Sequence, residues 1–374
     1  MDDAAGSITA RAERELRSLV GVSSPSGDVA GAEEALAIAA ALAPEEAQTE
    51  RVACSSPDHA PDMILRLRGT GEGRLLLVGH VDTVIPHRAH RPLTAEGDRL
   101  AGSGAVDMKG GVVLALGMLR ALAPRAAEFG EVALLLVCDE EWRTAPFAHS
   151  ARFAGFDACL CFEAGQLTED GRDAVVVRRK AAGTLRVRAH GRNAHSGSAP
   201  DRGINALLAL AQAAQLVAAQ HAPSGPARLT AVPTVIRSGD AFNVVPAEGE
   251  LVCDLRADGH AAFAAVQESI PPELGGARME SEMLRVWPGM DASEPTAELL
   301  ERTGAALGRE VVGAGRGGAS DASHFASSIP VTVDGLGPRG GGAHAPHEHV
   351  LRDSLRTRAE VAAAMVHAWL STRS

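Results

Sequence analysis

Acidic and histidine side chains stand directly after several short apolar runs of this sequence, and others stand in glycine-rich segments. These residues are His80, Asp82, Asp107, Glu140, Glu141, Glu163 and His344. Imidazole nitrogens and carboxylate oxygens are ligands of zinc-like ions, and two imidazoles with several carboxylates suffice for a pair of such ions. The chemistry that this set indicates is hydrolysis at a two-metal site.

Three buried parallel strands are the elements that would position these side chains. The apolar runs 75–78, 132–138 and 158–162 precede His80, the two adjacent glutamates and Glu163. In open α/β sheets, ligands bind beyond the carboxyl ends of such strands. We therefore expect these side chains to meet at one edge of the sheet.

The local positions of these residues suggest different tasks. Asp82 stands two residues after His80 and can reach the ring nitrogen that does not bind metal. Glu140 and Glu141 are adjacent at a strand end, so one can bind metal while the other faces the substrate. Asp107 lies between a glycine-rich loop and a helix start, where the alternative to a metal ligand is a helix N-cap.

Length and composition are those of an ordinary globular protein. The chain has 374 residues, enough for about two domains, with 45% hydrophobic and 22% charged residues. Its net charge of −11 and the lack of Lys/Arg-rich blocks argue against a nucleic-acid partner. No apolar segment approaches membrane-spanning length and the N-terminus lacks the features of a signal peptide, so we expect a cytoplasmic protein without a membrane partner.

The order of the expected elements divides the chain into two domains. Up to about residue 177 strands alternate with helices, which predicts an α/β fold with a mostly parallel sheet. Residues 179–288 carry the order β-α-β-β-α-β of an α+β split βαβ domain. An α/β pattern then resumes and ends in a helix at 354–371. We therefore predict a catalytic domain of residues 1–178 and 289–374 that is interrupted by the second domain.

Eight motifs occur in the order seen in the M20 family of metallopeptidases, which the chain resembles over roughly residues 10–370. They are GHVDTV, GSGAVDMKGG, DEE, the Glu163 segment, GRNAHSGSAPDRGINA, NVVP with DLR, GGASDAS and GGAHAPHE. Any one of these motifs is weak evidence, whereas all of them in register are strong evidence. The spacing in HSGSAPDRGINA is most similar to the glutamate carboxypeptidase branch. The resemblance implies a zinc-peptidase-like catalytic domain with an inserted, ferredoxin-like lid domain through which the protein forms a homodimer.

The resemblance also implies a ligand set for two divalent metal ions. Asp107 would bridge the ions, His80 and Glu163 would bind one of them, and Glu141 and His344 would bind the other. Zinc is the expected metal, and cobalt and manganese also suit these ligands.

The remaining roles follow from the same resemblance. Glu140 would be the general base, with Asp82 supporting the site. His195 would extend from the lid to the active site of the partner subunit and stabilise the tetrahedral oxyanion. Asn243 and Arg256 match lid positions that engage substrate oxygens, although Arg256 also suits a salt bridge within the sheet. A backbone-lined substrate loop would include Gly317, Gly318 and Ser320.

These assignments predict hydrolysis of a small-molecule amide or peptide that releases an amino acid from an N-acyl amino acid or a peptide-like substrate. Two alternatives stay open: an aminopeptidase or dipeptidase of the same fold, which needs a pocket for a free amine, and a non-catalytic binding relative. Two departures from the family pattern bear on the substrate. Trp142-Arg143-Thr144 replaces the small residues that usually follow DEE. Trp287-Pro288 stands where an Arg-Pro pair is expected, and Arg285, two residues earlier, could substitute for that arginine.

Overall fold

The N-terminal apolar runs form the centre of a six-stranded sheet in the computed structural model, which describes residues 2–372. The strands, in spatial order, are β1 (Gln48–Val52), β2 (Asp62–Arg68), β6 (Glu131–Val137), β3 (Arg74–His80), β7 (Ala158–Cys161) and β19 (Val331–Val333). β3 runs parallel to β6 and β7, and β7 runs parallel to β19. β1 and β2 run antiparallel to their neighbours, so the sheet is mixed and only its centre and one side are parallel.

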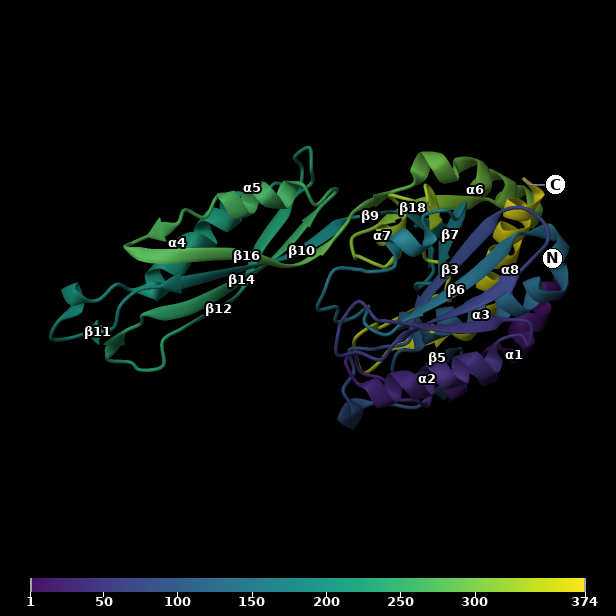
Figure 1. Ribbon diagram of the computed structural model, residues 1–374, viewed down its shortest axis with the longest axis horizontal. Helices are drawn as coiled ribbons and strands as arrows, with labels where there is room; N and C mark the ends of the chain where they lie inside the picture. The colour runs from purple at the N-terminus through teal and green to yellow at the C-terminus, as the bar shows by residue number, and fades with distance from the viewer. Residues whose placement is uncertain (1, 373–374) are drawn as a thin grey trace. The chain divides into compact units, whose positions relative to one another are not determined.

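Continuous apolar sequence places these strands in the interior, because both faces of the central sheet are covered. All seven residues of β6 are buried. On β3, Leu75 and Leu77 belong to the core that also includes α1 (Asp2–Val20), α3 (Gly110–Leu122) and α8 (Arg352–Ser371). α1 packs against α3 and α8, and α3 contacts β3 and β6 (Figure 1). Leu76 and Val78 alternate to the other face and are buried there.

The chain divides into two compact units. The first comprises the residues up to Arg178, Asp291–Gly315 and the residues from Ser320 onwards. The second comprises Arg179–Met290 and Arg316–Ala319. The segment that the sequence predicts as an inserted domain therefore lies in one unit. Its function as a lid and dimerisation domain stays a prediction.

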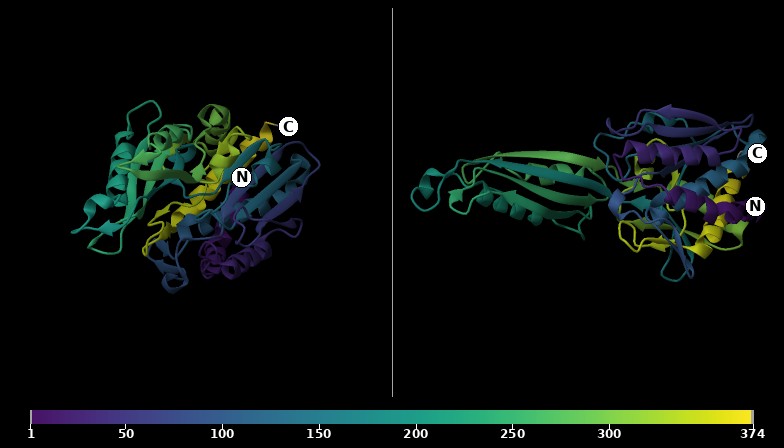
Figure 2. Two further views of the ribbon diagram at one scale, coloured as in Figure 1. Left: turned by 60° about the vertical axis from the view of Figure 1, so that its left-hand side comes forward. Right: turned by 90° about the horizontal axis from the view of Figure 1, so that it is seen from below.

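The second unit is built on a five-stranded antiparallel sheet. Its strands, in spatial order, are β12 (Thr230–Ser238), β14 (Glu248–Ala257), β10 (Ala181–His190), β16 (Ala277–Trp287) and β15 (Glu273–Leu274). With α4 (Ala206–Ala219) and α5 (Ala262–Glu268), the four long strands follow the predicted order β-α-β-β-α-β. Both helices pack on one face of the sheet, where they cover alternate β10 residues such as Leu185 and Val187 (Figures 1 and 2).

Shorter elements complete the two units. Those of the first unit or its boundaries are α2 (Val29–Leu42), β4 (Thr94–Glu96), β5 (Arg99–Ala101), β8 (Gln166–Leu167), β9 (Asp173–Arg179), β17 (Met290–Asp291), α6 (Ser293–Leu307), β18 (Val311–Arg316), α7 (Ala322–Phe325), β20 (Gly340–Gly341) and β21 (His349–Leu351). Those of the second unit are β11 (Ala194–His195) and β13 (Val244–Val245). β20, β21, β5 and β4 form a small sheet beside the segment that carries His344.

No helix between residues 2 and 372 combines the length and the apolar composition that crossing a bilayer requires.

Candidate metal centre

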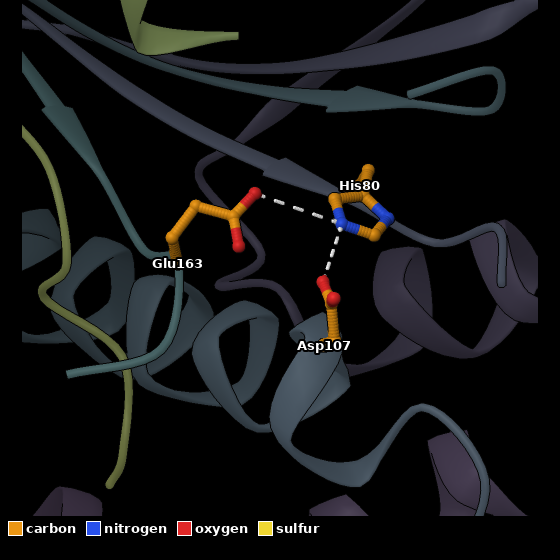
Figure 3. Close-up of side chains that lie close together, drawn as sticks. All are labelled: His80, Asp107 and Glu163. Atoms are coloured by element: carbon orange, nitrogen blue, oxygen red, sulfur yellow. Dashed lines mark hydrogen bonds and ion pairs between the residues drawn. The ribbon is translucent and has the colours of Figure 1, made fainter. Parts of the chain in front are cut away.

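Five predicted ligands lie together at the carboxyl ends of β3, β6 and β7, in two groups that share Asp107. One group is His80, Asp107 and Glu163, and the other is Asp107, Glu141 and His344. Figure 3 shows the three side chains of the first group pointing toward one another. Asp107 places Oδ1 3.2 Å from His80 Nε2 and Oδ2 3.2 Å from His344 Nε2. Each carboxylate oxygen thus belongs to a different group, as a bridging ligand requires.

The spacing of the donor atoms fits two divalent ions. His80 Nε2 lies 3.7 Å from Glu163 Oε1, and His344 Nε2 lies 3.1 Å from Glu141 Oε2. Donors that surround a tetrahedral zinc at about 2.1 Å are roughly 3.4 Å apart. The ring of His80 is oriented for this purpose, because its Nδ1 donates to the carbonyl oxygen of Asp82 at 3.0 Å and its neutral form presents the Nε2 lone pair.

The buried carboxylates of the centre also favour the binding of cations. Burial raises the pKa of the Glu140 carboxyl well above its ordinary value, and the carboxylates of Glu163, Asp321 and Glu141 raise it further while His80 opposes them. Burial opposes the charged form of His80, yet hydrogen bonds to Asp107 and Asp82 raise its pKa well above the ordinary value. Several carboxylates therefore compete for few positive charges. Divalent ions would neutralise this concentration of negative charge.

Asp107 is not the N-cap of the helix that follows it. α3 begins at Gly110, and no side chain caps its N-terminus. Asp107 lies one turn earlier, in a short π-helical segment (Ala105–Lys109).

 Asp107 has φ −124° and ψ 92°, and Met108 has φ −130° and ψ 32°, so the backbone of both residues is non-helical. The side chain of Asp107 is directed at His80 and His344, so the N-cap alternative is wrong.

Asp82 lies beside the ring of His80, within reach of the nitrogen that faces away from the ligand group. Asp82 is buried, with Oδ1 3.3 Å from His80 Nδ1. Its two carboxylate oxygens also accept from the backbone N–H groups of Glu140 (3.2 Å) and Glu141 (3.1 Å). One carboxylate therefore orients both a ligand imidazole and the backbone of the two adjacent glutamates, a second task that the sequence did not indicate.

Glu348 is a further residue of the centre that the sequence interpretation missed. It is buried, and Oε1 accepts from the backbone N–H groups of Val106 and Asp107, both at 3.0 Å. Its Oε2 accepts from the N–H of Gly104 at 2.8 Å. Glu348 thereby holds the backbone of the loop that presents Asp107. The only signal in the sequence is its place four residues after His344, within GGAHAPHE.

Replacement of Glu348 with alanine is expected to weaken metal binding by roughly 10- to 100-fold, because residues that support metal ligands typically have effects of this size. Competition with a chromophoric chelator measures the affinity. Glu348→Gln keeps one acceptor oxygen and should lose less. Wild-type affinity in Glu348→Ala would contradict a supporting role for this carboxylate.

Two predicted residues of the second unit, His195 and Asn243, lie next to each other and are exposed. His195 on β11 pairs with Val244 on β13, and the carbonyl of Asn243 accepts from the N–H of Ser196 at 3.0 Å. The Nδ1 of His195 accepts from the N–H groups of Gly197 and Ser198 at 3.1 and 3.2 Å. The neutral ring therefore carries its proton on Nε2 and offers a hydrogen-bond donor, as an oxyanion partner must.

Arg256 lies on β14 of the five-stranded sheet, whereas β11 and β13 form a separate two-stranded sheet. It pairs with Thr230 at the start of β12, whereas β11 and β13 lie beyond the end of that strand at Ser238. Eight residues of strand separate the two ends by roughly 25 Å. The alternative to substrate binding was a salt bridge within the sheet, and Arg256 does form one. Its Nη2 lies 3.1 Å from Asp254 Oδ1. Within one chain, His195 and Arg256 cannot contact the same small substrate.

The predicted substrate loop is divided between the units. Gly317 and Gly318 belong to the second unit, where the carbonyl of Gly318 accepts from Arg179 at 2.8 Å. Ser320 belongs to the first unit and is fully buried, and its hydroxyl donates to Asp334 at 2.6 Å. The side chain of Ser320 is thus engaged inside the protein. Substrate binding by this loop stays a prediction, and for Ser320 it is restricted to the backbone.

Comparison with known proteins places this geometry in a family. The model of peptidase family M20/M25/M40 matches residues 76–368. The chain belongs to this peptidase family. The resemblance stated from the motifs is therefore confirmed, and the chain is a metal-binding hydrolase that acts on amide bonds.

Individual M20 relatives differ in their reactions. The chain is 27% identical to carboxypeptidase G2 of Pseudomonas sp. (strain RS-16), an alignment that covers 82% of this chain and 76% of that protein. It is 30% identical to a succinyl-diaminopimelate desuccinylase of Methylobacterium nodulans, covering 72% of this chain and 74% of the relative. The crystal structure of aminopeptidase PepT from Bacillus cereus superposes with a TM-score of 0.74 at 19% identity, covering 96% and 98% of the two chains. Family membership therefore fixes the fold and the reaction class but leaves the substrate open.

Proposed function

We propose that this protein is a dinuclear metal amidohydrolase that releases an amino acid from an N-acyl amino acid or a peptide-like substrate. The observation that carries the proposal is Asp107, whose two oxygens belong to two separate ligand groups. Glu140 stands next to the ligand Glu141 and belongs to neither group, which leaves its carboxylate for proton transfer.

The proposed mechanism assigns proton transfer to Glu140. Bound divalent ions, with zinc as the expected metal, would polarise the amide carbonyl and acidify water. Glu140 takes a proton from the attacking water and passes it to the leaving nitrogen. The carboxylate of Asp82 accepts a hydrogen bond from the backbone N–H of Glu140, which fixes the backbone from which this side chain extends. His195 of the partner subunit donates from Nε2 to the developing oxyanion.

Recognition of a substrate carboxylate is the part of the proposal that concerns specificity. Ala182 of β10 lies opposite Arg256 on one side and Trp287 on the other, so these two residues share a face of the sheet. Arg285 and Asp254 flank Thr184 in the same way. This is the face that α4 and α5 leave uncovered, and the guanidinium of Arg285 lies 4.8 Å from the centre of the Trp287 ring. Arg285 can therefore replace the arginine expected at position 287.

Mass-spectrometric detection of free amino acids, released from a mixed pool of N-acyl amino acids and dipeptides, tests the function. The protein is first reconstituted with zinc or cobalt, and Glu140→Ala is the control. We expect release by the wild type alone, and the released amino acid identifies what Arg285 and Trp287 select. No release from any member of the pool, with two metals bound, would contradict the proposal. Release only from substrates with a free α-amine would favour an aminopeptidase or dipeptidase.

The second unit supports a homodimer as part of this proposal. His195 on β11 lies beyond the end of the five-stranded sheet that is opposite to Arg256, so the two residues would serve different active sites. β12 is an edge strand with exposed Val232, Val235 and Ile236, and such an edge is suited to pairing with a second copy.

Mixing two inactive variants tests whether subunits share residues. His195→Ala and Glu140→Ala subunits are each expected to be inactive as homodimers. Each mixed dimer should contain one site with an intact Glu140 and an intact partner histidine, so a 1:1 mixture should regain about a quarter of wild-type activity. Activity is measured after subunit exchange, with heterodimers verified by native mass spectrometry. Verified heterodimers without activity would contradict sharing of His195.

A further inference from the structure

Arg143 forms a buried ionic cluster directly behind the two adjacent glutamates of the metal centre. Its side chain is 2% exposed, and Asp139 and Asp321 on either side are 0% and 3% exposed. Nε and Nη2 donate to Asp139 Oδ1 at 3.1 and 2.9 Å. Nη1 and Nη2 donate to Asp321 Oδ1 and Oδ2 at 2.7 and 3.1 Å. The planar guanidinium thus binds two carboxylates at once, which a lysine cannot do with the same geometry.

Asp139, the first carboxylate of this cluster, closes a turn of the chain. Asp139 and Arg143 are four residues apart, and their ion pair closes the segment that carries Glu140 and Glu141. Asp82 holds the same segment from the other side through the backbone N–H groups of both glutamates. The turn is therefore fixed at its two ends by Arg143 and in its middle by Asp82.

The second carboxylate connects the turn to a distant part of the chain. Asp321 follows Ser320, whose hydroxyl donates to the buried carboxylate of Asp334. On the other side, Asp139 Oδ2 accepts from the backbone N–H and the hydroxyl of Ser56 at 2.9 and 2.7 Å. Arg143 thus joins three segments of the first unit at a point adjacent to Glu140.

The energetics of such a cluster favour a geometric function. Buried ion pairs often add no net stability over apolar residues of similar volume, because desolvation of the charges offsets their attraction. In some proteins they instead specify one arrangement of the chain. A cluster at this position would fix the direction of the carboxylate that transfers the proton.

We propose that Arg143 is a positioning residue that sets the geometry of Glu140 by locking the 139–143 turn to the segment of Asp321. This inference rests on the proposed function, in which Glu140 is the general base. Arg143 acts through the turn and does not contact the substrate.

Three variants separate positioning from stability. Arg143→Met leaves two buried carboxylates without their cation and is expected to lower the midpoint of thermal unfolding and to reduce kcat. In the triple variant Asp139→Asn/Arg143→Met/Asp321→Asn the charges are removed together, so the midpoint should recover. Its kcat should stay roughly 100-fold below wild type with KM little changed, because misplacement of a catalytic group costs about this much. Arg143→Lys keeps the charge without the fork and should have an intermediate kcat.

Hydrogen exchange supplies a readout that does not depend on turnover. The amides of residues 139–143 should exchange faster in the triple variant than in the wild type, while peptides from β6 should be unchanged. Recovery of both kcat and slow exchange in the triple variant would overturn the proposal and leave the proposed function intact. A wild type that hydrolyses no substrate with two metals bound would instead overturn the proposed function, and the positioning of a general base with it.

Discussion

Glu140→Ala is expected to lower kcat by roughly 10²- to 10⁴-fold, the range that positioned general acid–base groups contribute. The carboxylate belongs to neither ligand group, so the variant should still bind two metal ions. Steady-state kinetics on the substrate identified from the pool, together with elemental analysis of the purified protein, measure both quantities.

Controls make this result specific to proton transfer. Glu140→Gln preserves the size of the side chain but removes the base, so its kcat should fall by a similar factor. Glu169→Ala removes an exposed carboxylate that belongs to neither ligand group and should behave as the wild type. A fully active Glu140→Ala enzyme would refute the assignment of the base, and loss of metal from this variant would indicate that Glu140 is itself a ligand.

Asp107→Ala is expected to abolish activity through the metals, because it removes the one residue that both ligand groups contain. The variant should bind less than one metal ion per chain. Addition of zinc should raise the unfolding temperature of the wild type, since a ligand that binds only the folded state stabilises it, and this shift should be absent in the variant. Elemental analysis and thermal unfolding at several zinc concentrations test both statements.

Single-group variants are the matched comparison. His80→Ala and His344→Ala each remove a ligand from only one group, so each should retain about one metal ion. If Asp107→Ala retained two ions, or if loss of His80 released both, the division of ligands around Asp107 would be incorrect.

The sequence by itself determined the strands and the place where their ligands gather. β3 and β6 are continuous apolar runs, and such runs are typical of parallel strands covered on both faces. Because His80, Glu141 and Glu163 follow the ends of adjacent strands, their approach could be predicted from the strand pattern alone. The β-α-β-β-α-β order of the second unit was likewise readable, since period-two alternation on β10 is a local signal.

Only the tertiary structure decided which residues support those ligands. Glu348 reaches the Asp107 loop from 241 residues away along the chain, and Arg143 reaches Asp321 across 178 residues. Local patterns report the burial and the period of one segment, whereas these contacts depend on where two separate segments meet. Polar side chains at the edge of a buried sheet acquire their partners only when packing brings those segments together.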